Sequence, residues 1–213
     1  MYHNCIKNKI VLQQKKLFEV QVFPPIFFFR TLTRESILLE KYESYQKRSF
    51  RNKYIIASAQ GPYTLTIPLK KGKHEGQLIT EVQISYDESW QKKHLQTLVS
   101  AYRNAPFFEY YYTPVQELYA KAGEYLFEFN GLIIGYICEL LHLEPPGRTT
   151  QYDGSVDQDL RGRMTPKNYQ EFPVPPYNQV FEDRYGYLNN LSILDLLFCL
   201  GPESEIYLKA NAS

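Results

Sequence analysis

The chain has few cysteines and almost no net charge. Its 213 residues include only Cys5, Cys138 and Cys199, with no CxxC pair. We therefore expect neither a disulfide framework nor a cysteine-ligated metal, and we predict reduced thiols in a cytoplasmic protein. The formal net charge of +1 gives no overall field that would favour nucleic acid or a membrane surface as a partner.

Long apolar runs are also missing. The longest tracts, VFPPIFFF and LIIGYICELL, fall far short of the roughly 20 residues that a membrane-spanning helix needs. The first 20 residues lack the apolar centre of an export signal. The four histidines form no HxxxH pattern, so we expect no metal site, and no motif names a cofactor. These absences favour a soluble protein without a membrane segment.

Large aromatic side chains are abundant. The chain has 19 tyrosines and 13 phenylalanines, and 44% of its residues are hydrophobic. Such a composition is typical of a folded globule and argues against disorder. The length suits one domain, which we place at residues 17–213, after a tail of uncertain role at residues 1–16.

The first part of the domain, residues 17–86, is predicted to be mainly sheet. A buried strand over Leu17–Phe23, a helix after Pro24–Pro25 and a strand over Ser36–Glu40 would make a parallel, right-handed β–α–β unit. Two strand-like halves flank the turn signal at residues 60–62, and alternation predicts a further strand over Ile79–Ser85.

Residues 87–213 are predicted to be mainly helical. We expect a helix from Ser85 or Asp87 to Arg103, a second after Asn104, and one long helix or two within residues 117–143. Residues 147–187 have no clear period. A last helix should follow the N-cap Ser192 and stop at Gly201. The fold class is therefore α/β or α+β: an N-terminal mixed sheet with a β–α–β start, and a helical half packed on it.

Several segments together resemble the WbqC-like family. The matching segments, in order, are Pro24–Pro25, SYQKRSFRNKYII, LTIPL, WQKKHLQTLVSAYRNAPFFEYY, LFEFN, DLRGRMTPK, YNQVF and NLSILDLLFCLGPES. Cys199 departs from the pattern, where a polar residue such as Asn is expected. Members of this family occur in bacterial surface-polysaccharide gene clusters. The resemblance implies an enzyme of O-antigen biosynthesis that modifies a nucleotide-activated amino sugar, with glycyl or aminoacyl transfer as the suggested reaction. It supplies no catalytic residue.

The segment ESYQKRSFRNKYIIA, residues 43–57, carries the first candidate site. As a strand, its first half would be polar on both faces, so it must lie at an edge, a bend or a pocket wall. An exposed edge strand guarded by basic residues is one interpretation. The other is an anion site that suits the diphosphate of a nucleotide-sugar, built from Lys47, Arg48, Arg51 and Asn52, with the last two pointing into a pocket.

Three further residues could carry chemistry in the helical half. His94 could be a general base, since its ordinary pKa is near 6.5, or a packed core histidine. Glu109 could act as an acid or pair with an arginine. Tyr102 could contact a sugar, although large aromatics more often fill cores. An enzymatic site of this kind predicts that Arg51 and His94 converge in one pocket.

The segment DLRGRMTPK offers the remaining candidates, Asp159, Arg161 and Lys167. It is either a solvated charged loop or a lid that closes on an anionic substrate. Two function hypotheses follow from the whole sequence: a transferase acting on a nucleotide-sugar, or a non-catalytic nucleotide-sugar-binding or assembly component of the same pathway. The oligomeric state is not indicated.

Overall fold

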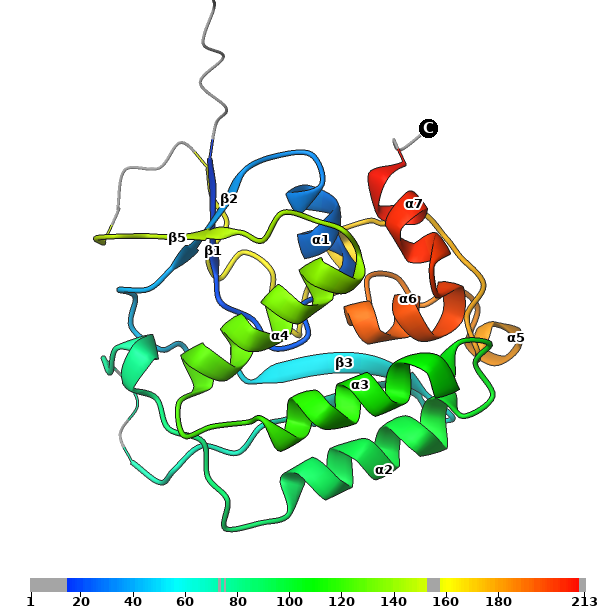
Figure 1. Cartoon of the computed structure of the whole chain (residues 1–213), viewed down its shortest axis with the longest axis horizontal. Helices are drawn as coiled ribbons and strands as arrows, with labels where there is room; N and C mark the ends of the chain where they lie inside the picture. The colour runs from blue at the N-terminus through cyan, green and yellow to red at the C-terminus, as the bar shows by residue number, and fades with distance from the viewer. Residues whose placement is uncertain (1–14, 73, 75, 153–157, 211–213) are drawn as a thin grey trace, which may run out of the picture.

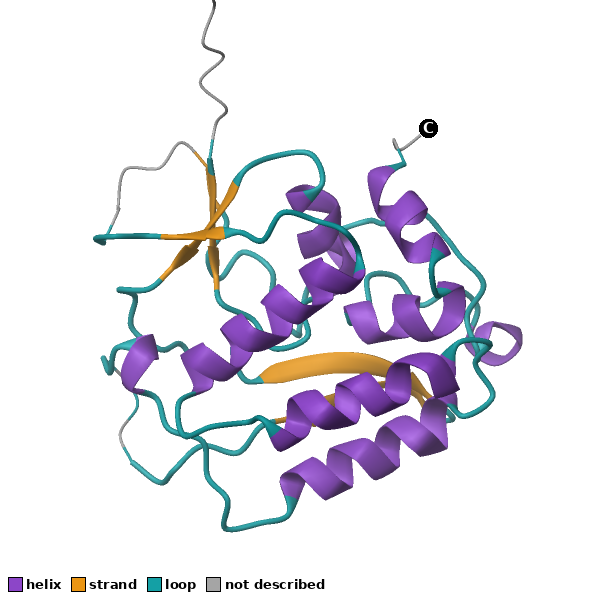
Figure 2. Ribbon diagram, in the orientation of Figure 1, coloured by secondary structure: helices purple, strands orange, loops and turns teal. Residues whose placement is uncertain are grey.

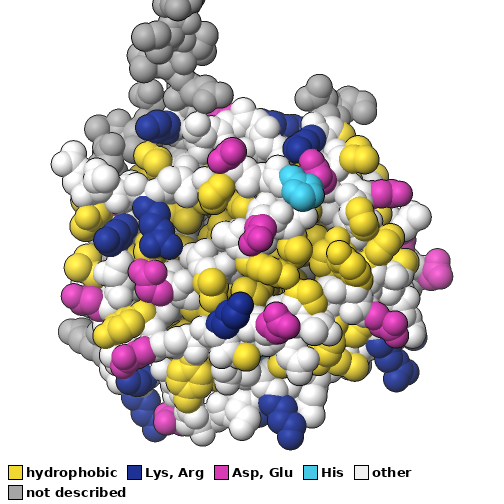
Figure 3. Space-filling view, viewed as in Figure 1, with side chains coloured by type: hydrophobic (Ala, Val, Ile, Leu, Met, Phe, Trp, Pro, Cys, Tyr) yellow, Lys and Arg dark blue, Asp and Glu magenta, His cyan; other side chains and the backbone are white. Residues whose placement is uncertain are grey.

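The computed structural model describes residues 15–72, 74, 76–152 and 158–210. The expected tail, residues 1–16, lies outside this part except for Lys15 and Lys16, and Lys16 already begins the first strand. On the face seen in Figure 3, acidic and basic side chains are interspersed around a band of hydrophobic ones.

The predicted β–α–β unit is confirmed. Strand β1 (Lys16–Glu19) leads to helix α1 (Ile26–Leu32) and to strand β2 (Ile37–Glu40), which pairs with β1 in parallel. Strand β1 is buried except at Lys16, and its two central residues, Leu17 and Phe18, are apolar, as is usual in parallel strands. The fixed φ of Pro25, −58°, places it at the N-cap of α1, immediately before the first helical residue.

Two short strands from the irregular segment extend this sheet. Strand β5 (Gly147–Arg148) pairs with β2, and strand β6 (Gln158–Asp159) pairs with β1, both in parallel. The strand order is β5-β2-β1-β6. All four strands therefore end at the same edge of the sheet.

The antiparallel strands form a separate two-stranded sheet (Figure 2). Strand β3 (Lys53–Ser58) and strand β4 (Gly61–Thr66) pair as a hairpin, with φ of +97° at Gly61. The expected fold class, α/β with a β–α–β start and a helical half, is confirmed, while the parallel and antiparallel strands form two sheets and not one mixed sheet.

The strand predicted over Ile79–Ser85 is wrong. The structure has a short 3-10 helix, η1 (Ile79–Glu81), followed by isolated bridges. Ile79 and Val82 are both fully buried and lie three residues apart, which is the spacing of one helical turn. The apolar alternation in the sequence hid this turn.

Three longer helices follow. They are α2 (Trp90–Tyr102), α3 (Phe108–Ala120) and α4 (Leu126–Leu140). The first two begin later than expected, because the Ser85 hydroxyl accepts from the amide of Asp87 in a turn and Asn104 caps no helix. Residues 117–143 hold the end of one helix and all of another.

The C-terminal elements are shorter. They are η2 (Tyr169–Glu171), α5 (Glu182–Tyr185), α6 (Ile193–Leu200) and α7 (Glu203–Lys209). The predicted cap is confirmed, since the Ser192 hydroxyl accepts from the amide of Leu194 at 3.3 Å. Gly201, with φ of +55°, ends α6 as expected.

The hairpin lies in the middle of the molecule. In Figure 1, β3 runs between α4 and α6 above and α2 and α3 below, and the small parallel sheet stands apart at the upper left. Helices α2 and α6 both contact β3. Within the described residues, no helix is long and apolar enough to cross a membrane.

Candidate functional site

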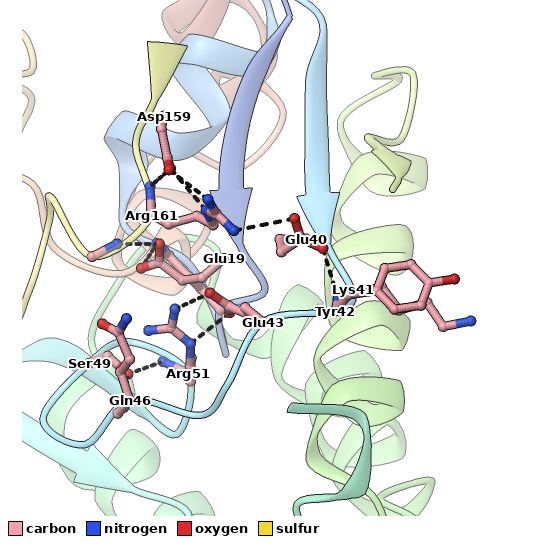
Figure 4. Close-up of polar contacts among 12 residues, drawn as sticks. Glu19, Glu40, Lys41, Tyr42, Glu43, Gln46, Ser49, Arg51, Asp159 and Arg161 are labelled. Atoms are coloured by element: carbon pink, nitrogen blue, oxygen red, sulfur yellow. Dashed lines mark hydrogen bonds and ion pairs between the residues drawn. The ribbon is translucent and has the colours of Figure 1, made fainter. Parts of the chain in front are cut away.

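Polar side chains gather where the parallel strands end. Glu19, Glu40 and Asp159 are the last residues of β1, β2 and β6 (Figure 4). Thr149 directly follows β5. The carboxyl edge of a parallel sheet is where open α/β folds place their ligands. This edge is therefore the first place to look for a site.

Arg51 brings the turn before the hairpin into contact with this edge. Its Nε and Nη2 donate to the two carboxylate oxygens of Glu43, at 2.8 and 2.5 Å. Both side chains are buried, and Asn130 of α4 donates to the backbone carbonyl of Arg51. A two-pronged arginine–carboxylate pair of this kind is strong and fixed in direction.

A second arginine links two strand ends. Arg161 donates from Nη2 to Asp159 Oδ2 at 2.7 Å, and from Nη1 to Glu40 Oε2 at 3.3 Å. The other oxygen of Glu40 accepts from the Thr149 hydroxyl at 2.8 Å and from the amide of Tyr42 at 2.7 Å. Asp159 is the open member, with 42% of its side chain exposed.

Glu19 lies between these two pairs and is fully buried. It accepts from Gln21 Nε2 and from the amide of Gly162, each at 2.9 Å. Gly162 has φ of +66°, and a Cβ there would lie 3.2 Å from Gln46 Oε1. Glycine is thus needed for the loop after β6 to reach Glu19.

We call Glu19, Glu40, Glu43 and Asp159, with Arg51 and Arg161, the carboxylate cluster. Its four carboxylates face two arginines, which leaves an excess of negative charge. Among the described residues, three buried side-chain atoms in or beside it have no hydrogen-bond partner: Arg51 Nη1, Gln21 Oε1 and Asn130 Oδ1. Unpaired buried polar atoms are costly, so they point to a bound group or water.

The carboxyl groups of the cluster differ in acidity. Burial raises the pKa of Glu43, the hydrogen-bonded Arg51 opposes this shift, and the charge of Glu19 adds to it. The hydrogen bond from Arg161 lowers the pKa of Asp159. Burial thus makes the Glu43 carboxylate a stronger base than that of an exposed glutamate.

The polar segment before the hairpin is a turn, with its residues in two different environments. Lys47 and Arg48 are exposed, and Arg48 has φ of +60°. Arg51 and Asn52 are buried, and Asn52 accepts from the Tyr45 hydroxyl and donates to the carbonyl of Ile67. Neither an edge strand nor an open pocket wall describes this segment, because its buried half is paired within the protein.

His94 has partners of its own. Its Nε2 lies 3.2 Å from the carbonyl oxygen of Thr66, and its Nδ1 lies 3.3 Å from the hydroxyls of Tyr54 and Tyr119. Burial lowers the pKa of His94 to about 4. Arg51 and His94 share no hydrogen-bond partner.

The other predicted residues also lie outside the cluster, except Asp159 and Arg161. Tyr102 is buried, donates to Asp195 at 2.6 Å and accepts from the amide of Ala57. Glu109 and Lys167 are exposed. Of the residues predicted from the sequence, Arg51, Asp159 and Arg161 therefore belong to the carboxylate cluster at the ends of the parallel strands.

Glu19, Glu40, Glu43 and Gln21 were missed by reasoning from the sequence. The available signal was a charged residue directly after a short apolar strand, in LFE and in ILLE. Once both strands are taken as parallel, their last residues must share an edge. Glu43 carries no such signal, because it does not end a strand. Its pairing with Arg51 depends on the fold of the turn between them, which the sequence pattern does not predict.

Within the described ranges, no group of three or more His, Cys, Asp and Glu side chains is placed to hold a metal ion. Five cavities of the described surface are lined by residues outside the cluster. The cluster is therefore a mostly buried network with one open side, at Asp159.

A family model, the WbqC-like protein family, matches residues 21–165. This range covers about two thirds of the chain. The chain belongs to the WbqC-like protein family. The matched range holds every residue of the carboxylate cluster except Glu19, so the cluster is built largely from the part that the WbqC-like family shares. Searches of curated proteins and of solved structures found no match.

Proposed function

We propose that this WbqC-like protein is a cytoplasmic transferase of surface-polysaccharide (O-antigen) biosynthesis that modifies a nucleotide-activated amino sugar. The reaction would transfer a glycyl or other aminoacyl group to the sugar amine. The observation that carries the proposal is the carboxylate cluster, whose negative excess suits an ammonium group. The network lies at the sheet edge where ligands bind in open α/β folds.

The sugar amine would bind at the open side of the cluster. Asp159 is the exposed carboxylate there, held in place by Arg161. An ammonium group hydrogen-bonded to a carboxylate gains more than a neutral hydroxyl would. The exposed Lys47 and Arg48, on the turn that ends at Arg51, and Lys167 beyond Arg161, would contact the diphosphate.

Glu43 would act as the base. The ammonium gives one proton to Glu43 before its nitrogen attacks the carbonyl carbon of an activated aminoacyl ester. As the new C–N bond forms and the C–O bond to the leaving group breaks, a second proton passes from the nitrogen to the leaving oxygen, which departs as an alcohol. Burial raises the pKa of this carboxyl, which favours proton acceptance.

Calorimetric titration with two nucleotide-sugars tests the binding step. One should carry a free amine and the other the same amine acetylated. We expect tighter binding of the free amine, and Asp159→Asn should weaken it about tenfold while leaving the acetylated sugar unaffected. Glu171→Gln, an exposed carboxylate outside the cluster, is the control. Equal binding of both sugars would contradict the proposal.

A transfer assay separates the enzyme from a binding component. Mass spectrometry would follow the amide product formed from an activated glycyl ester and the amino sugar. Glu43→Gln leaves Arg51 without its charge partner and should lower stability, so it is compared as folded protein confirmed by circular dichroism. The folded variant should keep binding and lose transfer at least a hundredfold, in the range of general-base catalysis. Binding by the wild type without transfer from any aminoacyl ester would favour the non-catalytic alternative, a nucleotide-sugar-binding or assembly component.

A further inference from the structure

A cleft lies at the end of β1 opposite to the carboxylate cluster. Helix α1, helix α7 and the segment 173–176 enclose a cleft of about 620 Å³, and Lys16, the first residue of β1, lines it. The carboxylate cluster begins at the last residue of the same strand. Helices α1 and α7 lie next to each other in Figure 1. A cleft of this size suits a small organic ligand.

The charges in this cleft are mainly positive. Arg30, Arg34 and Lys16 line it, and Glu35 is the carboxylate among its lining residues. Glu35 is already paired with Lys16, at 2.7 Å. Within the described ranges, neither arginine forms an ion pair with a carboxylate. Among the residues that the structure describes, the two arginine charges therefore lack a counter-ion.

Both arginines are held by neutral groups. Arg30, which is only 4% exposed, donates to the carbonyl oxygens of Tyr207 and Ala210, at 2.7 and 3.0 Å. Arg34 donates to the same Ala210 oxygen at 2.8 Å. These carbonyls end α7 and offset part of the charge. Burial and the nearby Arg34 nevertheless lower the pKa of Arg30, so its charge is incompletely compensated.

The remaining walls are apolar. Phe27, Tyr207 and the segment Pro173–Pro176, sequence PVPP, supply them. The guanidinium of Arg30 lies 5.4 Å from the centre of the Tyr207 ring, so the cleft places a cation directly beside an aromatic side chain. A bare inorganic anion would leave these apolar walls uncovered, whereas a ligand with a flat ring would cover them.

We propose that this cleft binds an organic phosphate that carries a planar ring, the chemistry of a nucleotide. The phosphate lies against Arg30 and Arg34, because guanidinium groups bind phosphate through paired hydrogen bonds. The ring lies against Phe27, Tyr207 and the prolines. The site is separate from the carboxylate cluster and does not depend on the function proposed for it.

Calorimetric titration of the full chain with four probes tests this site. They are uridine monophosphate, adenosine monophosphate, uridine without phosphate, and ribose 5-phosphate without a base. We expect the two nucleotides to bind at least tenfold more tightly than the probes that lack either part. Equal binding of ribose 5-phosphate and the nucleotides would overturn the role of the apolar walls.

Variants then locate the binding. Arg34→Gln removes an exposed charge, so the fold should persist, and nucleotide binding should weaken about tenfold. Arg103→Gln removes an exposed arginine outside the cleft and is the matched control for net charge. Equal losses in both variants, or none in Arg34→Gln, would overturn the proposal.

Two further comparisons complete the test. Arg30→Lys keeps the positive charge but loses the planar guanidinium with its paired donors, so it should weaken nucleotide binding more than tenfold. Arg48→Gln, an exposed arginine on the turn beside the carboxylate cluster, should leave binding of the monophosphates unchanged. If Arg48→Gln weakened their binding as much as Arg34→Gln, the nucleotide would lie beside the cluster, and the cleft would not be its site.

Discussion

Arg51 is a wholly buried arginine at the meeting point of the hairpin, α4 and the strand ends. Its guanidinium is hydrogen-bonded to Glu43, and its carbonyl accepts from Asn130. Removing one partner of a buried ion pair leaves the other charge without compensation in a low-dielectric interior. The pair therefore matters to stability whether or not Glu43 acts as a base.

We expect Arg51→Met to lower the free energy of unfolding by about 3–5 kcal/mol, because Glu43 stays buried and unpaired. The double variant with Glu43→Leu should recover a large part of this loss, since it replaces both charges by apolar groups. Urea unfolding at pH 7 measures both. If the single and double variants were equally unstable, lost packing, and not the unpaired charge, would be the cause.

At the residue scale, sequence reasoning found the right segment and the wrong environment. The basic residues at 47–53 indicated a polar role, but Lys47 and Arg48 are exposed and Arg51 is buried. The difference arises because the segment is a turn, with Arg48 at positive φ, and not a strand with alternating faces. Turn geometry of this kind is not encoded by residue alternation.

At the element scale, prediction succeeded where local chemistry is decisive. The β–α–β start followed from an apolar strand and two prolines, and the last helix followed from Ser192 and Gly201. It failed at Ile79–Ser85, where apolar alternation in the sequence predicted a strand but the chain forms a short helical turn. Strands β5 and β6, each two residues long, carry no pattern that a sequence could reveal.

Two glycines, one just after α6 and one inside α4, should respond in opposite ways to alanine. Gly201 has φ of +55°, and a Cβ there would lie 2.4 Å from ring atoms of Phe107. We expect Gly201→Ala to lower the free energy of unfolding by at least about 2 kcal/mol. Gly135 lies inside α4 with nothing within 4 Å of the added Cβ.

Gly135→Ala should therefore raise the free energy of unfolding by about 0.5–1 kcal/mol, because alanine is the better helix former. Thermal unfolding of the two variants beside the wild type gives both signs in one experiment. A stabilising Gly201→Ala would show that the end of α6 adjusts freely, contrary to the close contact with Phe107.

At the scale of the whole molecule, His94 connects the hairpin to the helical half. It lies on α2, its Nε2 donates to the Thr66 carbonyl of β4, and its Nδ1 faces Tyr54 of β3 and Tyr119 of α3. A carbonyl can only accept, so the neutral ring carries its proton on Nε2. Protonation would place a charge among buried aromatic rings and would put a second donor, Nδ1–H, against the hydroxyls of Tyr54 and Tyr119, while the hydrogen bond to Thr66 would remain.

We expect stability to fall as the pH falls from about 6.5 to about 4. The pKa of His94 is about 4 in the folded protein and about 6.5 in the unfolded chain, so the unfolded state binds the proton first. The contribution of His94 to the free energy of unfolding is complete above pH 6.5 and decreases by about 1.4 kcal/mol per pH unit below it, about 3 kcal/mol in all.

His94→Gln should remove this part of the pH dependence, while His142→Asn, at an exposed position, should keep it. Urea unfolding at pH 7, 6, 5 and 4 measures the difference between each variant and the wild type, in which the carboxylates cancel. An equal pH slope in His94→Gln and the wild type would mean that His94 stays accessible to protons in the folded state, and that the contact between hairpin and helices opens at this point.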